Sequence, residues 1–118
     1  MESDSFSLSA LSTAIETRNS ALLRSFYAEN ARMRIIDRDH PPSKPQEIVG
    51  RSAIAAYFDD VCGRTMTHKV ESGFVDGTHL AFTQNCAYPN GAHVFCSATA
   101  ELKGGKIANQ TIVQAWDA

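Results

Sequence analysis

The second half of the chain alternates between apolar and polar side chains from Met66 to Trp116. Three turn signals interrupt the alternation: Asp76-Gly77-Thr78, Pro89-Asn90-Gly91 and Gly104-Gly105-Lys106. A period of two is typical of half-buried strands, and Gly-rich or Asn-Gly turns are typical of hairpins. The pattern therefore predicts four consecutive antiparallel strands, over about 66–75, 79–88, 92–103 and 107–116.

The even-numbered positions of these strands carry most of the apolar side chains, so we expect them to face the core. They are Met66, His68, Val70, Ser72, Phe74, Leu80, Phe82, Gln84, Cys86, Tyr88, Val94, Cys96, Ala98, Ala100, Leu102, Ala108, Gln110, Ile112, Gln114 and Trp116. Three-residue hairpin loops keep the same parity inward on all four strands. Because several of these side chains are small, we expect a cavity over this concave surface; a helix filling the same space is the alternative.

The odd-numbered face carries small, mixed side chains that include Phe95, Ile107 and Val113. A solvated face would carry more Lys and Glu. We therefore expect this outer face to form a sheet-on-sheet homodimer, with a merely solvated sheet as the alternative.

The first half of the chain predicts helices. Over residues 6–28, Leu8, Leu11 and Ile15 recur at spacings of three and four, as one buried helical stripe requires. Asn19-Ser20 interrupts this pattern, and Ser20 is expected to cap a second short helix. An αα-hairpin and one bent helix both fit this region.

A short strand is predicted over 32–36, where Ile35 and Ile36 are β-branched. Residues 37–46 contain three prolines and predict a long loop. Gly50-Arg51-Ser52 is expected to open a third helix that ends near Gly63. The order of helices, strand, helix and four strands predicts an α+β fold in one domain over residues 1–118.

Charge and cysteine content exclude several classes of function. The 118 residues include 11 Lys and Arg and 13 Asp and Glu, for a net charge of −2. No basic stripe is present, which argues against nucleic acid as a partner. No apolar run of about 18 residues predicts a membrane span, and the acidic N-terminus does not resemble a secretion signal. Three cysteines without metal-like or CxxC spacing favour a reduced, cytoplasmic location.

Five segments, in this order, resemble the SnoaL-like families of the nuclear transport factor 2-like superfamily over residues 8–117. They are Phe26-Tyr27-Ala28-Glu29-Asn30-Ala31, Ile48-Val49-Gly50-Arg51-Ser52-Ala53-Ile54, Thr67-His68-Lys69-Val70, Val75-Asp76-Gly77, and Gly105-Lys106-Ile107 with Trp116-Asp117. The resemblance implies a cone-shaped, cystatin-like roll with N-terminal helices packed on a curved, mainly antiparallel sheet. The superfamily includes ketosteroid isomerases, epoxide hydrolases, polyketide cyclases, dehydratases and pocket proteins, so the fold does not name the activity.

Several acids that such enzymes use are absent from the matching positions. The isomerase base near the end of the first strand aligns with Ile35, and the deeper acid aligns with Ala98. The last-strand acid of epoxide hydrolases aligns with Ile112. Asp37 lies two residues beyond Ile35 and shares its facing, so it could reach into the mouth of the expected pocket. A plain turn residue at the start of the Pro-rich loop is the alternative.

His68 and Asp37 are the candidate catalytic residues. His68 is predicted to face inward, and histidine transfers protons near neutral pH. The candidate ligand-binding residues are Tyr27, Tyr57, Phe82, Gln84, Ala98, Gln110, Ile112, Gln114 and Trp116. The three glutamines are expected to orient a carbonyl or hydroxyl group of a ligand, or to satisfy one another.

No cofactor and no metal are expected, because His40, His79 and His93 lack the spacing of a metal site. Cys86 and Cys96 are interpreted as small buried hydrophobes, since no histidine lies near them in the sequence.

Three functions follow. The first is binding of a small apolar organic molecule. The second is a cofactor-free isomerase, lyase or polyketide cyclase-type enzyme that uses His68 and Asp37. The third is a protein-interaction module that acts through its sheet face.

Overall fold

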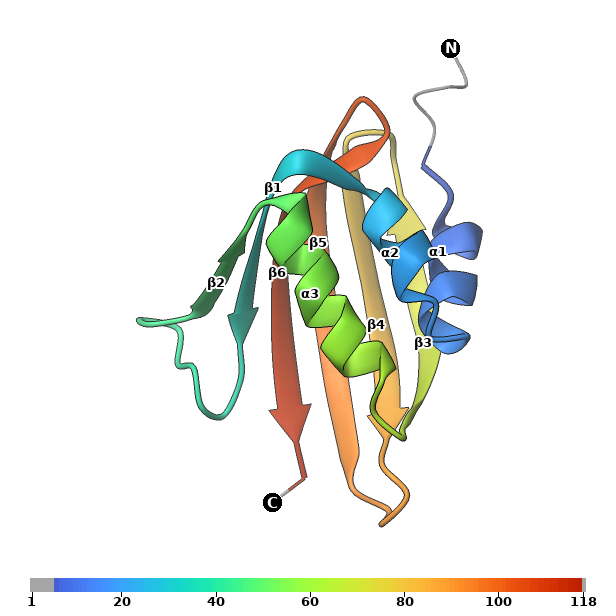
Figure 1. Ribbon diagram of the computed structural model, residues 1–118, viewed down its shortest axis with the longest axis vertical. Helices are drawn as coiled ribbons and strands as arrows, with labels where there is room; N and C mark the ends of the chain where they lie inside the picture. The colour runs from blue at the N-terminus through green and yellow to red at the C-terminus, as the bar shows by residue number, and fades with distance from the viewer. Residues whose placement is uncertain (1–5, 118) are drawn as a thin grey trace.

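Six strands form one curved sheet in the order β2-β1-β6-β5-β4-β3 in the computed structural model, which describes residues 6–117. The strands are β1 (Tyr27–Ile36), β2 (Gln46–Val49), β3 (Thr67–Val75), β4 (His79–Ala87), β5 (His93–Lys103) and β6 (Lys106–Trp116). Strands β1 and β6 run parallel, whereas the other neighbours are antiparallel. Helices α1 (Leu8–Glu16), α2 (Ser20–Ser25) and α3 (Arg51–Cys62) lie on one face of the sheet (Figure 1). The predicted fold class is confirmed.

The N-terminal helical region is shorter than predicted. It forms two helices, and Asn19 rather than Ser20 caps the second, since its Oδ1 accepts a hydrogen bond of 3.1 Å from the amide of Leu22. Strand β1 begins at Tyr27 rather than at residue 32. The amide of Ile107 donates to the carbonyl of Phe26, so pairing with β6 draws the chain out of the helix. Here a long-range strand pair overrides a local helical pattern.

The predicted loop over 37–46 ends one residue early, because Gln46 begins the short edge strand β2, which the sequence pattern did not predict. The prolines stay outside regular structure, as expected. The third helix follows its prediction closely, since Gly50 is its N-cap and Gly63 its C-cap. Met1–Ser5, part of the segment on which the prediction of no secretion signal rests, lies outside the described residues.

The four predicted strands agree with β3–β6 to within one residue at each end. The even-numbered side chains point inward throughout β4 and β5. Two bulges exchange the inward and outward positions at the end of β3 and at the start of β6. The first bulge is at Glu71, which has no partner between the pairs Val70–Gln84 and Ser72–Thr83. Phe74, expected on the inner face, therefore lies on the outer face and is 64% exposed.

The second bulge lies in β6, where Ala108 falls between the residues that pair with Glu101 and Leu102. Ile107, expected on the outer face, is therefore fully buried at 0% exposure.

The core lies between the helices and the inner face of the sheet. Helix α1 packs against β3, and α3 packs against β1 and α2. The small inward side chains of Ala98 and Ala100, on β5, are buried in this core. Within residues 6–117, no helix is both long enough and apolar enough to cross a membrane.

Candidate functional site

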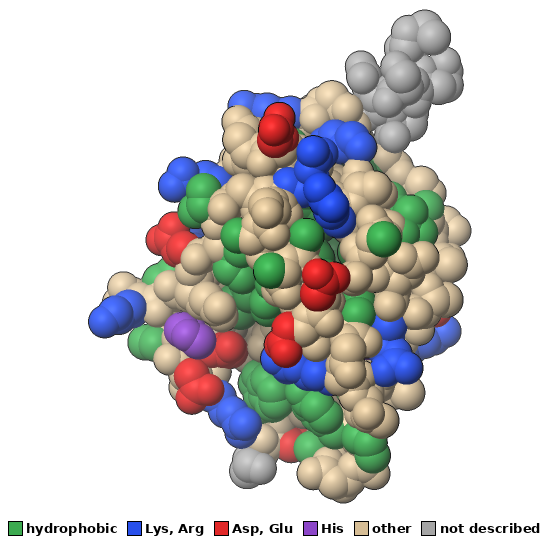
Figure 2. All heavy atoms as spheres, viewed as in Figure 1, with side chains coloured by type: hydrophobic (Ala, Val, Ile, Leu, Met, Phe, Trp, Pro, Cys, Tyr) green, Lys and Arg blue, Asp and Glu red, His purple; other side chains and the backbone are tan. Residues whose placement is uncertain are grey.

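A cavity of about 300 Å³ lies between the helices and the inner face of the sheet. Its size is at the lower end of the range, roughly 300–1,000 Å³, in which small-molecule sites fall. Figure 2 shows hydrophobic side chains gathered on this side of the molecule beyond the end of α3, with charged side chains along their upper border. The lining residues include Ile15, Leu23, Ile35, Phe58, Val61, Met66, Val94 and Ile112. These apolar side chains share the wall with polar and charged ones, among them Asp37, Asp39 and Arg64.

Most of the sequence-predicted site residues line this cavity. They are Asp37, Tyr57, His68, Gln84, Ile112, Gln114 and Trp116. Tyr27, Phe82, Ala98 and Gln110 are buried but do not line it. They share the inward facing of the others, and Tyr27 packs against Phe58 on α3.

Tyr27 and Gln110 form a buried polar pair. The Tyr27 hydroxyl donates a hydrogen bond of 2.6 Å to Oε1 of Gln110. Burial raises the pKa of Tyr27, so its hydroxyl remains a neutral donor. Among the described residues, no buried side-chain nitrogen or oxygen lacks a hydrogen-bond partner. The role of this pair is therefore structural.

A second chain of neutral polar groups does face the cavity. Nε1 of Trp116 donates a hydrogen bond of 3.3 Å to Oε1 of Gln114. Tyr57, on α3, lines the same cavity as Gln114. Burial is the main cause that raises the pKa of Tyr57 to about 12, with Gln114 opposing the shift. Tyr57 is thus a neutral hydroxyl in the cavity at physiological pH.

Aromatic side chains surround Trp116 at the cavity wall. Its ring stacks on that of Tyr88 with centroids 6.1 Å apart, and the guanidinium of Arg38 lies 4.6 Å from the Trp116 ring centroid. Arg64 donates to the hydroxyl of Tyr88 at 3.1 Å. These contacts hold a flat aromatic surface in place, with a cation over its face.

The two candidate catalytic residues have different partners. Oδ1 of Asp37 lies 2.8 Å from Nδ1 of His40, and the Asp37 side chain is the less exposed of the two, at 14% against 38%. Nδ1 of His68 lies 3.0 Å from Sγ of Cys86. Among the described residues, no hydrogen bond joins Asp37 to His68. They line one cavity as members of two separate pairs, and their joint action as acid and base stays a prediction.

The pair of His68 and Cys86 contradicts the expectation that no histidine approaches the buried cysteines. His68 on β3 lies directly opposite Cys86 on β4. Cys96, on β5, is the diagonal neighbour of Cys86, because Gln84 pairs with Cys96 and Cys86 pairs with Val94. The signal was available in the sequence: a hairpin centred on Gly77 places residues 68 and 86 opposite each other.

The neighbours of Cys86 lower the pKa of its thiol. The interactions with neighbouring Cys96 and with His68 favour the thiolate and outweigh the effect of burial. The pKa of Cys96 is raised by its interaction with Cys86 and by burial. Of the two cysteines, Cys86, which lies beside the imidazole of His68, therefore has the more acidic thiol.

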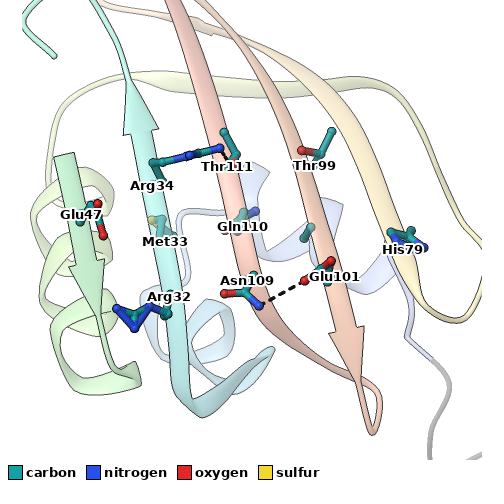
Figure 3. A pocket seen from close by; sticks show the side chains of 11 residues that line it. Arg32, Met33, Arg34, Glu47, His79, Thr99, Glu101, Asn109, Gln110 and Thr111 are labelled. Atoms are coloured by element: carbon teal, nitrogen blue, oxygen red, sulfur yellow. Dashed lines mark hydrogen bonds between the residues drawn. The ribbon is translucent and has the colours of Figure 1, made fainter. Parts of the chain in front are cut away.

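A wider, shallow depression of about 510 Å³ lies on the outer face of the sheet. Figure 3 shows Arg34 reaching from β1 to Thr111 on β6, with a hydrogen bond of 3.2 Å, and Asn109 donating to Glu101. Arg32, Glu47 and His79 also border it. This surface is polar and open, in contrast to the inner cavity. Within residues 6–117, no group of three or more His, Cys, Asp or Glu side chains is arranged to hold a metal ion.

A curved, mainly antiparallel sheet that holds a cavity under N-terminal helices defines a nuclear transport factor 2-like α+β roll. Residues 8–110 match the SnoaL-like domain, and the chain belongs to that family.

Solved structures agree with this assignment. An NTF2-like protein of unknown function from Mesorhizobium loti is 15% identical with a TM-score of 0.76, covering 89% of this chain and 84% of the other. A proposed ketosteroid isomerase from Kribbella flavida is 16% identical with a TM-score of 0.74, covering 92% and 73%. A computationally designed 17-OHP binder is 15% identical with a TM-score of 0.65, covering 92% of each chain. These identities show a shared fold alone. No curated protein sequence matches the chain.

Proposed function

We propose that this protein binds a small, largely apolar molecule that carries a carbonyl or hydroxyl group. The observation that carries the proposal is the inner cavity, in which apolar walls surround the neutral polar groups of Tyr57, Gln84 and Gln114. Apolar walls contribute roughly 25 cal/mol for each Å² of ligand surface that leaves water. Neutral donors and acceptors then orient one polar atom of the ligand without the cost of burying a charge.

The polar groups suit an oxygen-bearing ligand. A ligand carbonyl would accept from the Tyr57 hydroxyl or from the amide of Gln84, and a ligand hydroxyl would donate to Oε1 of Gln114. Tyr88 and Trp116, stacked on each other, add aromatic surface to the cavity wall against which a ligand can pack. The designed 17-OHP binder gives further support, because it uses a similar fold to bind its ligand.

Methyl NMR spectra test this proposal with three matched probes: cyclohexanone, cyclohexanol and methylcyclohexane. Ile112 lines the cavity, whereas its neighbour Val113 lies on the outer face of the same strand. We expect saturable shifts at Ile112 and Val94, little change at Val113, and tighter binding of the ketone and the alcohol than of the hydrocarbon. Equal shifts at Ile112 and Val113, or no saturation with any probe, would overturn the proposal.

Gln114→Leu and Thr99→Val form a matched pair of variants for this experiment. The first removes a polar group from the cavity, and the second alters the outer face. Loss of one hydrogen bond, about 1 kcal/mol, predicts a roughly fivefold weaker affinity for cyclohexanol in Gln114→Leu. Affinity for methylcyclohexane should hold in both variants.

Proton transfer at the same site is a second candidate function, because His68 and Asp37 both line the cavity. This function would make the protein a cofactor-free isomerase, lyase or cyclase. Once a substrate is found, His68→Ala and Asp37→Asn test the mechanism. Full activity in both variants would eliminate it.

We also propose that the outer face of the sheet pairs with a second copy of the chain. Phe95 and Val113 lie there at 43% and 46% exposure on neighbouring strands. Arg34 and Glu101 border the same face with opposite charges, so a two-fold contact can bring unlike charges together. A homodimer is the occupant that this self-complementary surface favours over an unrelated protein partner.

A further inference from the structure

Cys86 and His68 bring a thiol and an imidazole together at the wall of the cavity. They are directly opposed on β3 and β4, with Nδ1 and Sγ 3.0 Å apart, and both side chains line the inner cavity. A thiol and a base within about 2.6–3.2 Å of each other have the geometry of an activated nucleophile. Nothing in the proposed binding function uses this pair.

The surroundings of Cys86 favour a thiolate at this one cysteine. The interaction with Cys96 on the next strand and the imidazole of His68, 3.0 Å away, both lower the pKa of Cys86. The protonated Cys86 thiol can instead donate to Oε1 of Gln84 at 3.5 Å. The other titratable or charged side chains that line the cavity are Asp37, Asp39, Tyr57, Cys62, Arg64 and Tyr88. Since a thiolate in an apolar cavity needs a nearby cation, His68 is the group that would supply it.

We propose that Cys86, paired with His68, is a nucleophilic thiol that adds to small α,β-unsaturated carbonyl compounds in the cavity. The inference rests on the proposed function, because the same cavity must admit the molecule. It deepens that function by naming a chemical class of ligand, conjugated enones and enals, and by assigning the atom that reacts.

The addition balances without any further reactant. The lone pair of the Cys86 sulfur forms a bond to the β-carbon, and the carbon–carbon π pair moves toward the carbonyl to give an enolate. The His68 imidazolium then gives its proton to the α-carbon. The product is a saturated thioether on Cys86 and a neutral imidazole, and the reverse elimination restores both partners.

The neutral donors of the binding site support the same step. The charge that develops on the enolate oxygen is stabilised by hydrogen-bond donors already in place. The Tyr57 hydroxyl, which burial keeps neutral, is such a donor in the cavity.

The chain contains its own controls, because Cys62, Cys86 and Cys96 all line the cavity. Cys62 lies on α3 near Asp59, and burial together with this carboxylate raises its pKa. Cys96 is buried, and burial together with its interaction with Cys86 raises its pKa. Cys86 and Cys96 are both buried, so Cys96 is the control that matches Cys86 in access, whereas Cys62 is more exposed.

Reaction of the wild-type protein with cyclohex-2-enone near pH 6 tests the proposal, with the adduct located by peptide mass spectrometry. The larger thiolate fraction of Cys86 is partly offset by the lower nucleophilicity of an acidic thiol. We expect Cys86 to react about tenfold faster than Cys62 and Cys96. Equal rates at the three sites, or faster reaction at Cys62, would overturn the proposal, and this comparison needs no variant to fold.

His68→Gln measures the contribution of the imidazole. We expect the rate at Cys86 near pH 6 to fall about tenfold, and the midpoint of its thiolate ultraviolet absorbance to move to higher pH. Cys96→Ser, which keeps a donor beside Cys86, should retain the selectivity. An unchanged rate and midpoint in His68→Gln would overturn the assignment of His68.

Cyclohexanone separates this inference from the binding function, because it lacks the conjugated bond. Saturable shifts with cyclohexanone but no Cys86 adduct with cyclohex-2-enone would overturn the thiol chemistry and leave the binding function standing. An adduct at Cys86 without cyclohexanone binding would overturn the binding function and keep the thiol. Failure of both would end both proposals.

Discussion

Tyr27, at the start of the first strand, donates a hydrogen bond of 2.6 Å to Gln110 on the last strand, 83 residues away in sequence. Both side chains are buried. Strands β1 and β6 are the parallel neighbours in the sheet, and their pairing begins at Tyr27 and Ile107. This bond therefore ties the two halves of the chain together where they first meet.

Tyr27→Phe should destabilise the protein, because it leaves Oε1 of Gln110 buried without its donor. We expect the free energy of unfolding to fall by about 1–3 kcal/mol in a urea titration. Adding Gln110→Met should recover part of this loss, since both polar partners are then gone. Tyr88→Phe, at a half-buried tyrosine, is the matched control and should cost less. A Tyr27→Phe protein as stable as the wild type would contradict the structural role.

Alkaline pH should weaken the fold through the buried tyrosines. The pKa of Tyr57 rises from 10.0 to about 12 on folding, and burial also raises that of Tyr27. Above about pH 10 the unfolded chain releases these protons while the native state keeps them. Stability is thus fully present below pH 10 and falls as pH rises, by up to about 1.4 kcal/mol per pH unit for each tyrosine.

Urea titrations from about pH 9 to about pH 11 measure this slope. Tyr57→Phe should reduce it, because one of the titrating groups is removed. A stability that stays constant across this range would contradict the burial of both hydroxyls.

The extent of β3–β6 could be predicted from sequence because a period-two pattern and turn residues are local signals. The bulges at Glu71 and Ala108 could not be predicted, because neither glutamate nor alanine is a residue type that marks a bulge. Each depends on how the neighbouring strand twists. The start of β1 at Tyr27 was missed for a similar reason: its partner, Ile107, lies 80 positions further along the chain.

The candidate site shows the same division. Parity predicts which side of the sheet a residue faces, and it placed Ile112 and Gln114 correctly at the cavity. It says nothing about depth along the cone, so Ala98 was grouped with them although it is buried and does not line the cavity. The contact between His68 and Cys86 depends on hairpin register, which a search for nearby sequence motifs overlooks.

Gly73→Ala should destabilise the hairpin of β3 and β4. A Cβ at Gly73 would lie 2.7 Å from the carbonyl oxygen of Ala81 and 2.8 Å from Cβ of Phe82. The backbone must move to relieve these contacts, since neither atom is the end of a flexible side chain. We expect a loss of about 1–3 kcal/mol in urea unfolding. Ser72→Ala, at an exposed neighbour, is the control and should stay within about 0.5 kcal/mol.

The proposed homodimer predicts different effects for two exposed phenylalanines on the outer face. Phe95 lies on the central strand β5, whereas Phe74 lies on β3 at the edge of the sheet. A charge at the centre of a sheet-on-sheet contact must be buried without a partner, but a charge at the edge remains in water. Phe95→Glu should therefore yield monomers in sedimentation velocity at micromolar concentration, and Phe74→Glu should leave the dimer largely intact. A monomeric wild-type protein, or equal effects of the two variants, would contradict an interface centred on β5 and β6.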